Sequence, residues 1–232
     1  MGFSDSQHFR KTLAGACMVL APLLFVVAFV VSPRLETSAG KQLAVAADNL
    51  DRYYIANLIG MVGLILVVPA VLGLMHMLRE RRPQYGAIGG GLTMIGILMS
   101  LVGCGVGFVV WQMATDGVQP ADVTALHGVM HATGSVVPLY IVPLVGIVGV
   151  VALGAGLYLA RVVDWWMALF FAAGVVCINI AFPAGILALG IVGAALMLVG
   201  LGSMGLMVLS ESDAEWEHVP DYHGMRPAAG MS

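Results

Sequence analysis

The amino-acid sequence predicts an all-α protein, an integral membrane bundle of six transmembrane helices. Three observations predict this fold class: 60% of the 232 residues are hydrophobic, only 10% are charged, and the mean hydropathy is +0.97. A soluble domain carries roughly 25% charged residues, so this chain has too little polar surface to cover itself in water. Its charges also lie between long apolar runs, and runs of about 18 or more apolar residues are typical of membrane-spanning helices.

The apolar runs are continuous, which favours helices over a transmembrane β-barrel, whose strands alternate apolar and polar residues. The six helices are predicted over residues 12–32, 53–78, 86–114, 136–160, 165–182 and 184–209. Residues 1–210 then form one transmembrane domain. Residues 211–232 are polar and acidic, and we expect them to form a mobile cytoplasmic tail.

Sequence signals mark where these helices stop. Pro33 ends the first, the charged stretch 79–82 ends the second, and Arg161 ends the fourth. Pro183 is expected to mark the tight turn between the last two helices. Trp165 opens the fifth helix, at the interfacial depth that aromatic rings prefer. The first run is longer than the 7–15 residues of a typical signal-peptide core, so we expect it to be retained.

The distribution of lysine and arginine predicts that both termini are cytoplasmic, in a bacterial plasma membrane. The residues assigned to the inner side are Arg10, Lys11, Arg79, Arg81, Arg82, Arg161 and Arg226, against Arg34, Lys41 and Arg52 on the outer side. Arg79, Arg81 and Arg82 are predicted to contact lipid headgroups. Two outer segments, 38–52 and 121–133, are expected to form short helices at the membrane surface.

Small residues recur four positions apart within the predicted helices, which lets helix backbones approach closely. The pairs are Gly86/Gly90, Gly103/Gly107, Ala152/Gly156 and Gly190/Ala194. Packing inside one bundle is the favoured interpretation. A homodimer face, or a face for another membrane protein, is the alternative. Because the helix over 86–114 is the richest in glycine, we expect it to occupy the centre of the bundle.

No predicted span carries an acid or a base near its middle, so no catalytic residue is predicted. This pattern disfavours ion-coupled transporters, proton pumps and intramembrane proteases. Asn57 and Asn179 are the notable polar residues within spans, and they predict either polar packing between helices or contacts to a ligand. The net charge of −3, without a basic patch, excludes nucleic acid as a partner.

His127 and His131 are the strongest candidates for metal ligands. They lie four residues apart, so on a helix they share one face, and two imidazoles on one face bind zinc or copper when a third ligand joins them. Asp122 is the predicted third ligand, with Asp116 as an alternative. No glutamate lies between the histidines, which excludes the zinc-protease pattern. No cofactor is predicted otherwise, and a metal ion or haem at this outer face is an alternative.

Four segments of the chain resemble a family of multi-pass membrane proteins common in actinobacteria. They are 54–81, 86–91, 110–112 and 182–185. The resemblance implies a six-helix fold but no activity and no site residues. Three functions remain open. The first is a non-enzymatic accessory subunit, scaffold or lipid-interacting component, whose partner is the lipid bilayer. The others are a transporter or binder of a small lipophilic molecule, and an outer-face metal- or haem-binding redox protein.

Overall fold

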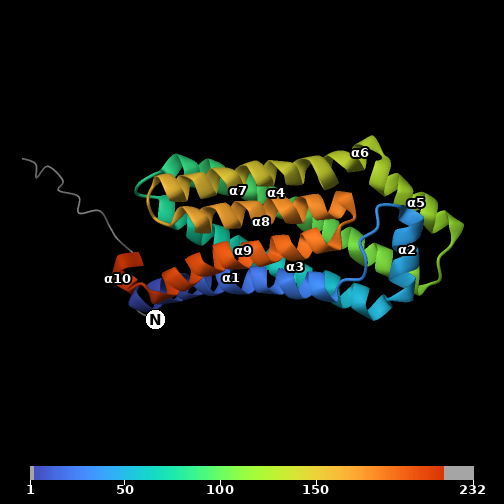
Figure 1. Ribbon diagram of the computed structural model, residues 1–232, viewed down its shortest axis with the longest axis horizontal. Helices are drawn as coiled ribbons and strands as arrows, with labels where there is room; N and C mark the ends of the chain where they lie inside the picture. Colours follow the sequence, from blue (N-terminus) through green and yellow to red (C-terminus); the bar gives the residue numbers. More distant parts are fainter. Residues whose placement is uncertain (1–2, 217–232) are drawn as a thin grey trace, which may run out of the picture.

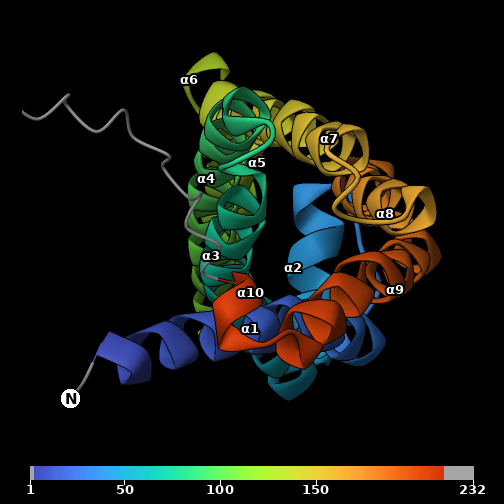
Figure 2. The same cartoon turned by 90° about the vertical axis from the view of Figure 1, so that its left-hand side faces the viewer.

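Six long helices stand side by side and close into a ring (Figure 2). The computed structural model describes residues 3–216, and no strand occurs among them. In ring order the helices are α1 (Phe3–Val31), α3 (Leu50–Leu78), α4 (Pro83–Thr115), α7 (Val142–Leu159), α8 (Trp165–Ala184) and α9 (Leu187–Ser210), after which α9 packs against α1. Six helices are long and apolar enough to cross a membrane, the fourth of them running through α7 and the helical turns just before it, which confirms the predicted fold class.

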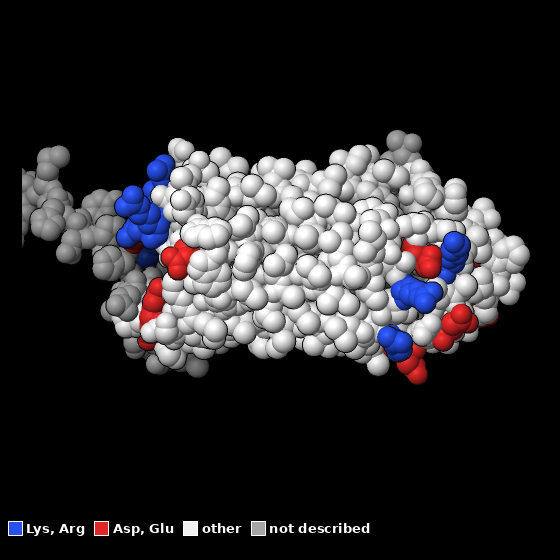
Figure 3. Space-filling view, in the orientation of Figure 1, with Lys and Arg blue, Asp and Glu red and all other residues white. Residues whose placement is uncertain are grey.

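The charged side chains lie at the two ends of the molecule and leave the middle bare. Figure 3 shows this on one face, where lysine, arginine, aspartate and glutamate occupy the ends of the long axis. The bare zone matches what the hydrocarbon core of a bilayer requires, because a charged side chain there is costly. The six spans are therefore those of a multi-pass membrane protein.

The two ends of the bundle differ in structure. One end holds the start of α1, the two turns α3–α4 and α7–α8, and the helical turn α10 (Asp213–Trp216) (Figure 1). The other end carries α2 (Ala39–Asp48) and α5 (Pro120–His131), the two predicted surface helices, and also α6 (Thr133–Val136). Apolar residues of α2 and α5 pack with the end of α4 in a small core of their own that includes Leu43, Val110 and Leu126.

The main core lies toward the end that holds the start of α1 and the helical turn α10. Its largest fully buried side chains are Met18, Val71, Leu74, Leu78, Leu153, Leu157, Phe171, Leu201, Met204 and Val208. Toward the opposite end, by contrast, none of the residues 98–109 of α4 and none of 175–180 of α8 is buried. The bundle is thus packed most densely next to the α3–α4 and α7–α8 turns.

Glycine contacts set the distance between α4 and α7. A Cβ added at Gly96 would lie 2.6 Å from the Cα of Gly146, and one added at Gly149 would lie 2.4 Å from the backbone nitrogen of Thr93. Two turns further along α4, Gly103 has open space around it. The close approach therefore ends where the π-helix η1 (Val137–Ile141) precedes α7. This π-helix interrupts the helix predicted over 136–160.

The predicted pairs of small residues mostly face neighbouring helices of the same bundle. Gly90 faces Met75 of α3, Gly156 faces Tyr85 of α4, and Gly190 faces Phe29 of α1. The prediction that the helix over 86–114 lies at the centre is wrong. In a ring no helix is central, and the outward face of α4 is exposed along residues such as Ile88 and Leu98.

The turn between the last two spans differs from the prediction at Pro183. This proline lies inside the last turn of α8, and the helix ends at Gly185, whose φ of 66° is left-handed. The backbone N–H of Ile186 donates to Ala181 O and that of Gly185 to Phe182 O. This pair of hydrogen bonds is the Schellman motif, for which glycine is the usual residue at the left-handed position. A proline in the final turn costs few hydrogen bonds, so the helix continues through it.

Replacing Gly96 with alanine is expected to destabilise the bundle, whereas the same change at Gly103 is expected to be close to neutral. The new methyl group at Gly96 meets the backbone of Gly146, so α4 and α7 have to move apart, and such overpacking costs about 1–3 kcal/mol. Thermal unfolding of the two purified variants in detergent measures the difference. Equal melting temperatures would contradict the close approach of α4 and α7.

Candidate functional site

The turn between α7 and α8 holds an arginine in a backbone conformation that favours glycine. Arg161 has a φ of 54° and is the one non-glycine residue with positive φ among residues 3–216. Its backbone N–H donates to Tyr158 O and that of Val162 donates to Leu157 O, as in the motif that Gly185 completes after α8. A left-handed non-glycine residue costs about 1–3 kcal/mol, and such strain is concentrated at functional sites.

Arg161 lines a cavity of about 340 Å³ at the end of the bundle. Tyr158, Asp164 and Trp165 also line this cavity, so it combines one positive charge, one negative charge and two amphipathic rings. Tyr158 lies in the last turn of the apolar span that ends at Leu159, Arg161 and Asp164 follow that span, and Trp165 begins the next one. The cavity therefore sits at the boundary between hydrocarbon and headgroups, where Tyr and Trp are enriched.

A second, apolar cavity of about 230 Å³ continues from the first between α7 and α8. The two share Tyr158 and Trp165, and the apolar part is lined by Val151, Gly154, Ala155, Ala168, Leu169 and Ala172. We call the two together the α7–α8 groove. It forms because α7 packs less extensively on α8 than any other neighbouring pair in the ring packs together.

The charged side chains of the groove have no polar partners among residues 3–216. Neither the Arg161 guanidinium nor the Asp164 carboxylate makes a hydrogen bond or ion pair with the part of the chain that the structure describes. A second guanidinium lies close by, because Arg81 Nη1 donates to Ala160 O at 2.8 Å. This bond joins the α3–α4 turn to the C-terminus of α7, where a cation is favoured by the helix dipole.

The three arginines predicted to contact headgroups lie in or beside the α3–α4 turn, at the same end as the groove. Arg81 and Arg82 are exposed. Arg79 forms an ion pair with Glu80, in which Arg79 Nη2 lies 3.8 Å from Glu80 Oε1. Their contact with lipid stays a prediction. Sequence reasoning assigned Arg161 only to the end of a helix and missed its strained turn, although the aromatic residues Tyr158 and Trp165 on either side of it were a usable signal.

The two asparagines within the spans have different partners. Asn57 Nδ2 donates to Cys104 O at 3.0 Å, so it joins α3 to α4, and the absence of a side chain at Gly107 makes room for it. Asn179 Nδ2 donates to Val175 O, one turn back on its own helix. Asn57 therefore takes part in packing between helices, whereas Asn179 is satisfied locally and does not line the α7–α8 groove.

The structure brings His127 and His131 together but does not bring Asp122 to them. The two imidazole rings lie side by side on α5, with centroids 4.4 Å apart, and both residues are exposed. The Asp122 carboxylate accepts the Gln119 backbone N–H at 2.9 Å and so caps the start of α5. Within residues 3–216 no three histidine, cysteine or acidic residues are grouped to hold a metal ion. Metal binding here stays a prediction that needs a ligand from elsewhere.

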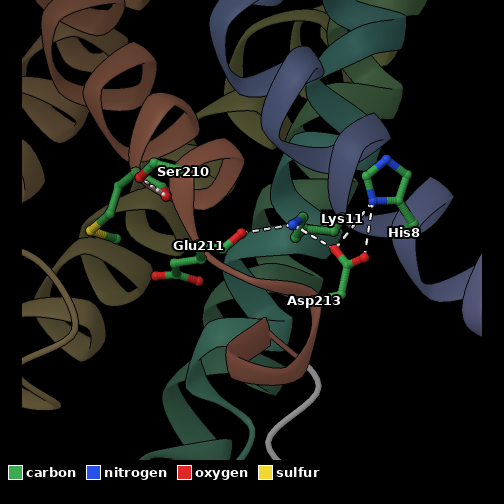
Figure 4. A network of polar contacts seen from close by, with 6 residues as sticks. His8, Lys11, Ser210, Glu211 and Asp213 are labelled. Carbon is green, nitrogen blue, oxygen red and sulfur yellow. Dashed lines mark hydrogen bonds and ion pairs between the residues drawn. The ribbon is translucent and has the colours of Figure 1, made fainter.

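A polar network joins the first span to the residues that follow the last one (Figure 4). Lys11 Nζ donates to Glu211 O at 2.8 Å and pairs with the Asp213 carboxylate, which also lies 3.0 Å from His8 Nδ1. Lys11 is only 5% exposed, so its charge is held by these contacts.

An aromatic contact extends the same docking of the C-terminal turn. Trp216 is buried and its ring stacks on that of His76 in α3, with centroids 4.6 Å apart, while His76 Nε2 donates to Trp216 O at 3.0 Å. Residues 211–216, assigned to the tail in the sequence prediction, are therefore packed against α1 and α3. The rest of that predicted tail, 217–232, lies outside the described residues.

Comparison with known proteins adds no homologue to this description. No family model, no curated protein and no solved structure matches the chain. The resemblance to an actinobacterial membrane-protein family therefore stays a prediction.

Acidification is expected to release the C-terminal turn from α1. Hydrogen bonding from Lys11, and secondarily from His8, lowers the pKa of Asp213 below its ordinary value of 3.8. A lowered pKa means that the contact stabilises the docked turn above pH 3.8 and that this contribution disappears as the pH falls through the lowered value. Hydrogen exchange of amides 211–216, corrected for intrinsic rates, is expected to speed up on acidification.

Asp213→Asn should show the faster exchange already at neutral pH, since the amide carries no charge to pair with Lys11. Asp116→Asn, at the opposite end of the bundle, is the matched control and should leave these amides unchanged. If the D213N variant exchanges like the wild type at neutral pH, the ion pair does not hold the turn.

Proposed function

We propose that this protein is a non-enzymatic, lipid-interacting component of the bacterial plasma membrane that holds a phospholipid in the α7–α8 groove. The observation that carries the proposal is the Arg161 guanidinium, which has no polar partner in the described part of the chain and is held by a strained turn at the mouth of an apolar groove. Guanidinium binds phosphate oxygens through two parallel hydrogen bonds, so it is well suited to a phosphodiester headgroup.

The depth of the groove fits a lipid that stands in the bilayer. Val151 and Tyr158 both line the apolar part and lie seven residues apart on α7, which corresponds to about 10 Å along a helix. A headgroup beside Arg161 would therefore leave the first part of an acyl chain against Val151, Ala155 and Leu169. The polar cavity, at about 340 Å³, is within the range of about 300–1,000 Å³ common for small-molecule sites.

The strain at Arg161 supports function over stability. Glycine would complete the same turn without strain, as it does at Gly185, so the arginine is kept at a cost of about 1–3 kcal/mol. Its side chain makes no hydrogen bond or ion pair within the described residues that would offset this cost. A bound ligand is the simplest partner for the Arg161 guanidinium.

The remaining parts of the proposal come from the sequence. The bias of lysine and arginine supports an orientation in which the groove faces the cytoplasmic leaflet, where anionic lipids and polybasic turns attract each other. The lack of acids and bases in the middle of the spans supports a role without catalysis. An accessory or scaffolding role toward another membrane protein is compatible with a bound lipid, because the outer faces of the ring stay open to a partner.

Arg161→Gly is expected to separate lipid binding from stability. The variant should bind phospholipid about tenfold less, since a charge-assisted contact is lost. Its free energy of unfolding should be unchanged or raised by up to about 1 kcal/mol, because glycine relieves the backbone strain. Native mass spectrometry of the purified protein with added phospholipid measures the first quantity, and thermal unfolding in detergent measures the second.

Arg82→Ala is the matched control, because it removes a cation from the same end of the bundle without touching the groove. An equal loss of lipid in R82A and R161G would mean that diffuse charge, not the groove, attracts the lipid. Wild-type protein that retains no phospholipid at all would refute the proposed function.

A further inference from the structure

Asp164 departs from the usual behaviour of an aspartate at the start of a helix. It is the N-cap residue of α8, with extended backbone angles of −67° and 150°, yet its side chain makes no capping hydrogen bond. An N-cap aspartate normally accepts the backbone N–H of the second or third helical residue. Here the carboxylate lines the polar cavity of the α7–α8 groove beside Arg161 instead.

The cavity thus presents two opposite charges that do not neutralise each other. Arg161 and Asp164 are three residues apart, both are exposed to the cavity, and no ion pair joins them in the described part of the chain. A ligand with a single negative charge would satisfy the guanidinium but would be repelled by the carboxylate. A ligand that carries both charges, a short distance apart, would satisfy both groups.

We infer that the groove selects a zwitterionic phospholipid with a primary ammonium group, of the phosphoethanolamine type. The inference rests on the proposed function. The phosphate lies at Arg161, and the ammonium group, two carbons away from the phosphate ester oxygen, lies at Asp164. A primary ammonium carries three N–H donors that can hydrogen-bond to a carboxylate, whereas the trimethylammonium of a choline headgroup carries none. Trp165 adds an aromatic face to the same cavity, and such a face attracts a cation.

The experiment is a competition between three lipids with identical acyl chains and ethanolamine, glycerol or choline headgroups. Each is offered to the full-length protein in detergent, and the bound lipid is counted by native mass spectrometry. The wild type should retain the ethanolamine lipid about tenfold over the glycerol lipid, as expected for one charged hydrogen-bonded contact. The choline lipid should fall between the two.

Asp164→Asn is the discriminating variant, because asparagine is an equally good N-cap and keeps the start of α8. It should retain less of the ethanolamine lipid than the wild type and lose the preference for ethanolamine over glycerol. Asp116→Asn, at the other end of the bundle, should keep the preference.

The outcomes separate the two proposals. If the wild type binds the three lipids equally, or prefers the glycerol lipid, the headgroup inference is wrong while the lipid-binding function stands. The same holds if D164N keeps the full preference. If none of the three lipids is retained by the wild type, the proposed function itself fails.

Discussion

Close approach of helix backbones is the constraint on which this bundle depends. Apolar side chains gain little by leaving lipid for one another, so helices in a membrane associate through van der Waals packing where small residues let them meet. Here α4 meets α7 along glycines such as Gly96 and Gly146, and α8 meets α9 in the same way at Gly174. Contacts between neighbouring helices are extensive around most of the ring, and the contact between α7 and α8 is the weakest.

The loosest joint in the ring is the one that carries the candidate site. α7 packs extensively on α4 but much less on α8, and the α7–α8 groove lies along this second contact. The bond from Arg81 to Ala160 then fixes the end of α7 from the α3–α4 turn. Arg161 is presented to the groove by a turn that is anchored on both sides.

The sequence alone was sufficient for the spans and the two surface helices, because length, hydropathy and charge position are local properties. The order of the helices in the ring could not be predicted from the sequence. A glycine such as Gly96 indicates that another helix comes close, but it does not identify that helix. The left-handed conformation of Arg161 could not be predicted either, because an arginine in a turn does not by itself indicate a positive φ. Asp122 shows a third limit: its carboxylate suits a metal ion and a helix cap equally well, and only the geometry reveals the second use.

The closure of the ring by α9 against α1 has a consequence for how the protein is made. Synthesis proceeds from the N-terminus, so α1 enters the membrane first and its final neighbour enters last. Until then the surface around Gly15, which a Leu209 side chain and the backbone of Gly205 later cover, faces lipid or the insertion machinery. A chain whose synthesis stops before the sixth span lacks α9, so its helices form an open arc in which α1 has no neighbour on that side.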